Sequence, residues 1–228
     1  QLSRTILIYD EVHNLGTDLK LDVLENLNQK VGFKLGLSAT PNLGGFKKTQ
    51  TQRLLKTVGQ IIYEFGIEEA IQRGILCEFN YKFLEYVLTE EELNKKNELI
   101  GKSWGAQGAG NTGAEEALRN QIARIHKSAE DKLRAFENHL KDYPELLEST
   151  IIFTIEKKYA YQVAEIIMKY TNNFRNYFAK TDSSNLQRFK RKEIDILITC
   201  DAVSQGIDIP DLNNIILFSA DKGTEGRS

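Results

Sequence analysis

Two groups of polar residues near the start of the chain contain the side chains best suited to chemistry. The first group supplies two carboxylates and an imidazole, from Asp10, Glu11 and His13. The second supplies two hydroxyls, from Ser38 and Thr40. Carboxylates can bind a metal ion or accept a proton, and hydroxyls can both donate and accept hydrogen bonds. We therefore expect these two groups to mark a site.

The elements that must position these side chains are indicated by the apolar runs before them. Residues 6–9 are apolar and end abruptly at the acidic group, and residues 35–37 lead to Ser38 in the same way. Such runs are typical of buried parallel strands, and ligands collect beyond the carboxyl ends of these strands. Residues 18–29 place leucines among charges, which predicts the crossover helix that two parallel strands need.

The same alternation of strands and helices resumes at Ser149. Strands are predicted at 150–154, 176–179, 195–199 and 212–218, and helices at 156–170 and 185–192. This order predicts an α/β fold whose parallel sheet is covered by helices on both faces. Thr154 and Thr199 end two of the predicted strands, where small donors can contact a phosphate. Alternatively, they are there because threonine is common in strands.

A glycine, an aspartate and a proline form a second candidate corner late in the chain. Gly206 lets the main chain come close to a ligand, and Asp208, held by Pro210, can accept a hydrogen bond from a ribose hydroxyl or orient an arginine. The alternative is a tight turn that is capped by the aspartate and stopped by the proline.

Together these groups resemble a known family. Asp10-Glu11-Val12-His13 resembles motif II, the Walker B box, of superfamily-two helicases and translocases of the DEAD/DEAH type. Ser38-Ala39-Thr40 resembles their motif III, and Val203-Ser204-Gln205-Gly206-Ile207-Asp208-Ile209-Pro210 their motif V. The sequence between these motifs is similar to that of XPB-like repair translocases and of restriction and phage helicases.

The resemblance implies two incomplete RecA-like motor domains in tandem, with parallel sheets flanked by helices. The first domain would occupy residues 1–82 and the second residues 83–228. A helical, glycine-rich insertion is expected at about 90–145.

The resemblance also implies roles for the first group of residues. Asp10 would hold Mg²⁺, through water, and Glu11 would orient and deprotonate the water that attacks ATP. His13 would link this site to Ser38 and Thr40, which would pass the nucleotide state to the nucleic-acid track.

Further roles are implied for residues later in the chain. Gly206 and Asp208 would bind ATP, and Thr154 and Thr199 would hold the nucleic-acid backbone. Arg227 stands where an arginine finger is expected, although Gly223 occupies the position of the motif's glutamine.

The phosphate loop that this class of ATPase needs, G-x-x-x-x-G-K-[ST], is not evident in the sequence. Gly101-Lys102-Ser103 fits its end, but Lys96 stands at the first glycine position. A flexible turn is the preferred interpretation. The 228-residue chain by itself is therefore predicted not to hydrolyse ATP.

Several local structures are predicted from composition and periodicity. Residues 101–113 are glycine-rich and predict a mobile loop or hinge tip, with Trp104 folded onto a nearby helix rather than stacked on a base. Residues 118–140 predict one long amphipathic helix. Residues 46–58 predict a basic helix whose charges either face solvent or contact phosphates.

The segment that follows predicts further short elements. Residues 61–65 and 79–88 predict strands, the second crossing from one domain to the next. Residues 67–73 predict a short helix that is ended by Gly74. Thr89 and Glu92 predict a capping box that starts another helix.

Composition sets the remaining expectations. The net charge is −2, so no global basic field indicates a nucleic-acid binder, although a local basic groove is compatible with a translocase. Cys77 and Cys200 lack zinc-ligand spacing, which favours a reducing cytoplasm or nucleus. The expected partner is double-stranded or partly single-stranded DNA, with no membrane. The alternatives are an RNA helicase and a non-catalytic nucleic-acid-binding module.

Overall fold

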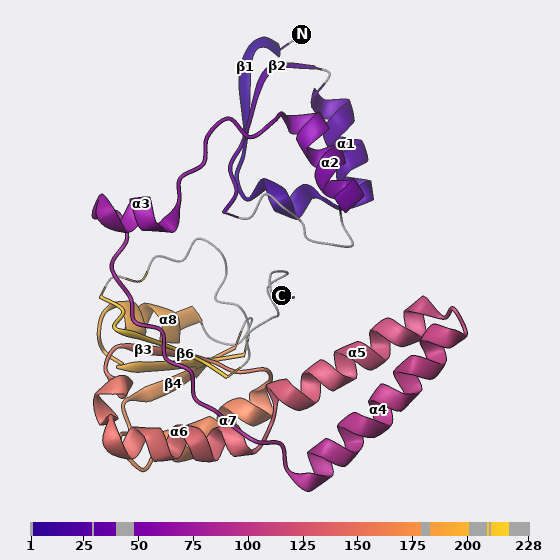
Figure 1. Cartoon of the computed structure of the whole chain (residues 1–228). Coiled ribbons are helices and arrows are strands. Elements are labelled where there is room, and N and C mark those ends of the chain that lie inside the picture. The colour runs from indigo at the N-terminus through magenta and orange to yellow at the C-terminus, as the bar shows by residue number, and fades with distance from the viewer. Residues whose placement is uncertain are drawn as a thin grey trace. The chain divides into compact units, whose positions relative to one another are not determined.

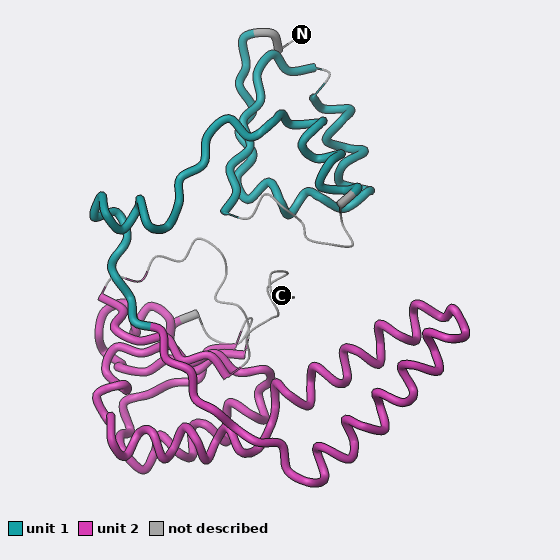
Figure 2. Tube along the Cα trace, in the orientation of Figure 1, with its two compact units in different colours: residues 1–80, 222–228 teal, residues 81–221 magenta. Residues whose placement is uncertain are grey.

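The computed structural model describes residues 2–28, 30–39, 48–178, 183–200, 209 and 211–218. These residues form helices and two parallel sheets (Figure 1), so the predicted α/β class is confirmed. The chain divides between Asn80 and Tyr81 into two compact units (Figure 2). The described part of the chain contains no helix with the length and apolar character needed to cross a bilayer.

Unit 1 is built on the predicted strand–helix–strand crossover. Its elements are β1 (Leu2–Tyr9), η1 (Val12–Leu15), α1 (Asp18–Asn28), β2 (Val31–Gly36), α2 (Lys48–Val58) and α3 (Ile67–Gln72). β1 and β2 pair in parallel, with Ile8 opposite Leu35 and Tyr9 opposite Gly36. This register brings the carboxyl ends of both strands to the same edge.

The core of unit 1 lies between its helices and one part of its sheet. The buried residues Val12, Leu21, Leu24 and Leu54 form this core, with Tyr9 and Val58 packed against it. The prediction that the apolar side chains of β1 are buried is wrong for Ile6 and Ile8, which are each 55% exposed. β1 pairs only with β2 in the described part of the chain, so little covers those side chains.

Two further strands predicted in unit 1 and at its border are not formed. Residues 61–65 and 79–88 have strand-like composition but join no ladder among the described residues. A strand needs a partner to satisfy its main-chain groups, and composition does not supply one. By contrast, the predicted short helix α3 is present, and Gly74 follows it with φ +67°, the left-handed conformation that glycine tolerates.

The first helices of unit 2 differ from the predictions made for residues 101–113 and for Trp104. They are α4 (Glu90–Gly108), α5 (Thr112–Lys127), α6 (Asp131–Asp142) and the short η3 (Pro144–Leu147). The predicted loop over 101–113 is wrong, because α4 continues to Gly108 and packs along α5 with Leu99 and Ser103 buried. Tertiary packing outweighs the weak helix propensity of glycine here. Trp104 is 70% exposed and so is not folded onto a neighbouring helix.

The start of α4 and the break after α5 are fixed by specific contacts. Thr89 and Glu92 form the predicted capping box, with Glu92 N donating to Thr89 Oγ1 at 3.2 Å and Thr89 N donating to Glu92 Oε2 at 2.9 Å. The single long helix predicted over 118–140 is wrong, because Ser128 ends α5. Glu92 Oε1 accepts a hydrogen bond from Glu130 N at 3.0 Å, and this contact helps to hold the break.

The sheet of unit 2 follows the predicted parallel pattern. Its elements are β3 (Thr150–Phe153), α7 (Lys157–Ile167), β4 (Phe174–Tyr177), α8 (Ser183–Lys190), β5 (Ile196–Thr199) and β6 (Asn214–Leu217). The strand order is β4-β5-β3-β6, and every pair is parallel. Ile152, Ile196 and Ile198 pack with α6 and α7. Ile151 and Leu197 pack with α8, so helices cover both faces as predicted.

Candidate functional site

Asp10, Glu11 and His13 lie next to the stretch that contains Ser38, at the carboxyl ends of β1 and β2. Leu37 N donates to Tyr9 O at 2.8 Å, and Val12 N donates to Leu37 O at 2.9 Å. These main-chain hydrogen bonds extend the pairing beyond the strands. They bring the stretch that follows Tyr9 next to the stretch that contains Ser38.

Glu11 adopts a backbone conformation that is uncommon for a residue with a side chain. Its φ and ψ are 48° and 47°, in the left-handed region. Such strain persists only where the surrounding structure enforces it, and it is often found at functional sites. The turn at Glu11 leads directly into η1, and Glu11 N donates to Asp10 Oδ1 at 3.0 Å. The result is a compact corner with two adjacent carboxylates.

His13 connects this corner to the second strand end. His13 Nδ1 lies 2.8 Å from Ser38 Oγ and 3.3 Å from Glu11 Oε2. One ring nitrogen cannot bond both well, and the shorter contact is the hydrogen bond. Glu11 Oε2 is consequently buried without a hydrogen-bond partner, although the imidazole is near. A buried carboxylate oxygen without a hydrogen bond is costly, so the arrangement favours an incoming donor or a positive charge.

The donor set at this corner fits a magnesium ion that is shared with a phosphate ligand. Mg²⁺ usually binds one or two protein carboxylates and completes its octahedron with waters and phosphate oxygens. Asp10 directly precedes Glu11 in the chain, is exposed and offers a second carboxylate at this corner. Among the described residues no three His, Cys, Asp or Glu side chains converge on one point, so a metal site made entirely of protein ligands is not found there.

The packing of Val12 and the small size of Gly36 hold this corner in place, and the sequence analysis assigned neither residue this role. Val12, between Glu11 and His13, is 7% exposed and packs in the core of unit 1. A Cβ atom on Gly36 would lie 3.1 Å from Val12 Cγ1 and 3.0 Å from Val58 Cγ1. The absence of a side chain at Gly36 therefore permits the close packing of η1 and α2 at the end of β2.

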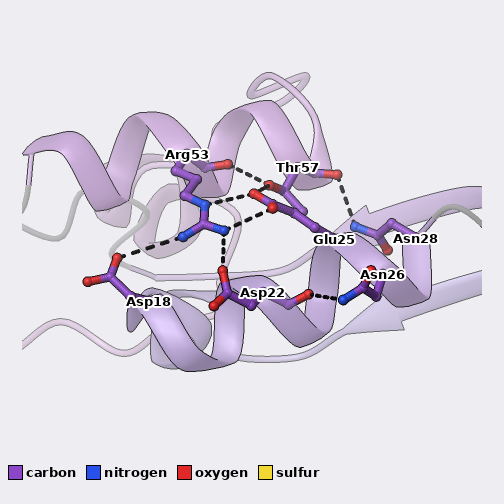
Figure 3. Close-up of polar contacts among 7 residues, drawn as sticks. All are labelled: Asp18, Asp22, Glu25, Asn26, Asn28, Arg53 and Thr57. Atoms are coloured by element: carbon purple, nitrogen blue, oxygen red, sulfur yellow. Dashed lines mark hydrogen bonds and ion pairs between the residues drawn. The ribbon is translucent and has the colours of Figure 1, made fainter.

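Arg53 in the basic helix α2 contacts acidic side chains of α1. Neither of the two predicted alternatives, a charge facing solvent or a charge contacting phosphates, included this contact. Arg53 forms ion pairs with three carboxylates that lie one turn apart along α1: Asp18, Asp22 and Glu25 (Figure 3). Arg53 Nε donates to Glu25 Oε1 at 2.7 Å. This hydrogen bond lowers the pKa of the Glu25 carboxyl group. The spacing i, i+4, i+7 of the acidic residues was a signal for this contact.

In unit 2, Thr154 and Thr199 lie at adjacent strand ends, as predicted, because β3 and β5 pair with Phe153 opposite Thr199. Both are buried, with exposures of 3% and 0%. Thr154 Oγ1 donates to Thr199 O at 3.2 Å. Their contact with a nucleic-acid backbone stays a prediction.

Four predicted site residues, Thr40, Gly206, Asp208 and Arg227, lie outside the described residues. The roles predicted for these four residues therefore stay predictions. Gly101, Lys102 and Ser103 are in the interior of α4. They form neither the predicted turn nor a phosphate loop, which would have to precede a helix.

Comparisons with known proteins show what this chain is similar to. Residues 131–227, from α6 onward, match the family described as "Helicase conserved C-terminal domain". The predicted resemblance to superfamily-two helicases is confirmed.

Two curated relatives extend over most of this chain. The irc3 protein of Schizosaccharomyces pombe, named as a mitochondrial ATP-dependent helicase, is 23% identical and covers 93% of this chain. The ATP-dependent helicase IRC3 of Saccharomyces cerevisiae is 20% identical and covers 94%. The chain spans 32% and 29% of these relatives, about a third of their length.

A solved structure confirms the fold of the helicase-like chain. The helicase domain of Hef from Pyrococcus furiosus aligns with 94% of this chain and 65% of its own, with a TM-score of 0.52 and 12% sequence identity. At this identity the likeness shows the fold alone. It agrees with the RecA-like α/β arrangement that the sequence motifs imply.

Proposed function

We propose that this chain is part of an ATP-dependent DNA helicase or translocase, which couples ATP hydrolysis to movement along nucleic acid. The observation that carries the proposal is the link from Glu11 through His13 to Ser38, since it joins two strand ends of one sheet. The match of residues 131–227 to the helicase C-terminal domain supports the same conclusion.

The residues of unit 1 have distinct proposed roles. Asp10 would hold Mg²⁺ through water, and the bound metal would supply charge neutralisation at the transferred phosphoryl group. Glu11 orients the attacking water and accepts its proton. His13 links this corner to Ser38, so that a change at the nucleotide reaches the segment after β2.

The remaining roles concern the second half of the chain and the setting of the protein. Gly206 and Asp208 contribute to ATP binding, and Arg227 is the candidate arginine finger. Thr154 and Thr199 lie along the nucleic-acid track. We place the protein in the cytoplasm or nucleus and take double-stranded or partly single-stranded DNA as its substrate.

The decisive experiment measures ATP hydrolysis by the longest natural polypeptide that contains this chain. Double-stranded DNA, single-stranded DNA and RNA are compared as activators at equal nucleotide concentration. We expect Glu11→Gln to abolish turnover with every activator while nucleic-acid binding persists. A motor behaves in this way because the substitution removes the proton acceptor and leaves the binding surfaces intact.

The matched control is Glu64→Gln, since Glu64 is an exposed carboxylate in the same unit and forms no ion pair with another described residue. It is expected to leave turnover unchanged. Activation by RNA alone would favour an RNA helicase. Nucleic-acid binding without any ATPase activity in the unmodified protein would favour a non-catalytic module. The 228-residue chain alone is expected to be inactive, because its only Gly-Lys-Ser sequence lies within α4.

A further inference from the structure

A line of polar contacts runs from the end of β1 to the end of α2. Tyr9 Oη donates to Asn28 Oδ1 at 2.6 Å, and Asn28 Nδ2 donates to the main-chain oxygen of Thr57 at 3.0 Å. Asn28 is only 9% exposed. The amide therefore uses its acceptor toward one element and its donor toward another, and an asparagine is the residue that can do both at this length.

The far end of this line is itself held firmly. The Thr57 carbonyl also accepts a hydrogen bond from Lys34 Nζ at 3.1 Å. Thr57 Oγ1 donates to Arg53 O at 2.7 Å and lies 3.3 Å from Glu25 Oε1 (Figure 3). Through these contacts the end of α2 is tied to α1 and β2. Asn28 thus connects β1 to a fixed point rather than to a free helix end.

The near end of the line adjoins the candidate site. Tyr9 directly precedes Asp10, and both Tyr9 and Val58 pack against the core cluster that contains Val12. Val58 follows Thr57 and meets Val12 at Gly36, where both side chains approach the glycine closely. A displacement of the Asn28 amide would therefore reach the corner by two routes, one through Tyr9 and one through Val58.

We propose that Asn28 is a positioning residue for the corner formed by Asp10, Glu11 and His13. This inference rests on the proposed function, because it assigns Asn28 to the geometry of that site. The Asn28 side chain sets the separation between the end of β1 and the end of α2. That separation in turn sets the contact between His13 and Ser38.

The test is Asn28→Asp in the 228-residue chain. The side chain keeps its shape but loses its donor, and a carboxylate oxygen then faces the Thr57 carbonyl oxygen. The measurement is the imidazole signals of histidine in NMR spectra at fixed pH. The chain has three histidines, and His126 and His139 are both in unit 2. They serve as internal references, and we expect the His13 signals alone to shift.

The matched control is Asn26→Asp, two residues earlier in α1. Asn26 is exposed, and its Nδ2 donates to Asp22 O at 3.0 Å (Figure 3). This substitution also exchanges an amide for a carboxylate, but at an exposed side chain whose hydrogen bond stays within α1. We expect the His13 signals to stay at their original positions.

The outcomes separate positioning from simple stabilisation. If Asn28→Asp lowers the thermal stability of unit 1 and the His13 signals of the folded protein do not move, the proposal is overturned. If the variant unfolds unit 1, Tyr9→Phe replaces it, since this change removes only the hydroxyl bond to Asn28. Unmoved His13 signals in Tyr9→Phe would also refute positioning. Neither readout depends on ATP hydrolysis, so failure here is distinct from failure of the proposed function.

Discussion

β1 of unit 1 and β5 of unit 2 both contain an apolar run that leads to candidate site residues, yet the two runs differ in burial. Ile196, Leu197 and Ile198 of β5 are each 0% exposed, whereas Ile6 and Ile8 of β1 are each 55% exposed. β5 lies between two strands and beneath helices on both faces, but β1 pairs only with β2 in the described part of the chain.

The comparison shows that the burial of a strand is decided by its neighbours rather than by its own residues. Unit 2 fixes its strand ends by hydrophobic packing around a central strand. Unit 1 has a smaller core and relies more on polar contacts, including the Arg53 cluster and the Asn28 bridge (Figure 3). The candidate corner of unit 1 should therefore respond to polar substitutions, and unit 2 to the loss of apolar volume.

The largest expected effect is the loss of apolar volume in β5. Ile198→Ala should lower the free energy of unfolding of unit 2 by about 2–5 kcal/mol, because a buried side chain is replaced by a cavity. Ile8→Ala should cost about 1 kcal/mol or less in unit 1, because the side chain is already half exposed. Hydrogen exchange followed by mass spectrometry resolves the two units. Equal losses of protection in both would remove the contrast.

Replacing either of two glycines by alanine should change stability by a smaller amount, and the two changes should have opposite signs. Gly36→Ala should destabilise unit 1 by about 1–3 kcal/mol, because its Cβ would press on Val12 and Val58. Gly105→Ala should stabilise α4 by about 1 kcal/mol, since nothing lies within 4 Å of its Cβ position and alanine favours helix. Chemical denaturation combined with hydrogen exchange measures both. A stabilised Gly36→Ala protein would show that the close packing at β2 is not constraining.

The smallest expected effect is on the loss of stability of unit 1 at acidic pH. The Arg53 hydrogen bond lowers the folded-state pKa of Glu25, so its stabilisation is present above the ordinary carboxyl pKa and is lost as the pH falls through the folded value. Arg53→Met should flatten this acid dependence in unit 1. In unit 2, the Val87 N–H lowers the pKa of Asp131, and the acid dependence there should persist.

The control for Arg53→Met is Arg73→Met, since Arg73 is exposed and its ion pair is with Glu69, one turn earlier in α3. It should leave the acid dependence of both units unchanged. The measurement is the protection of each unit from hydrogen exchange as the pH is lowered below about 4.5, the ordinary value for a glutamate carboxyl group. An unaltered profile for Arg53→Met would assign the dependence to other carboxylates.

Much of the fold could be predicted from local sequence patterns, and the elements that were predicted wrongly share one cause. The strands of unit 2, the crossover of unit 1 and the Thr89 capping box depend on local patterns that the chain satisfies. Residues 61–65 and 79–88 have the composition of strands but no partner strand in the described part of the chain. The helical path of α4 through its glycines likewise depends on packing along α5, which no local pattern reveals.

The candidate site divides in the same way. The carboxylates, the imidazole and the serine hydroxyl were identified from residue types at predicted strand ends, and β1 and β2 bring Asp10, His13 and Ser38 together. Gly36 and Asn28 were not identified, because a glycine in a strand and an asparagine near a helix end have many local explanations. Only the atoms that surround them show why those residues are needed.

By itself the sequence determined the α/β class, the parallel crossovers and the residue types at the strand ends, since each is a short-range pattern of hydrophobicity and charge. The tertiary structure alone decided which strands are buried, where the helical hairpin turns and which side chains hold the acidic corner. Those outcomes depend on contacts between residues distant in sequence, such as Tyr9 with Asn28 and Asn28 with Thr57, and their geometry exists only once the chain has folded.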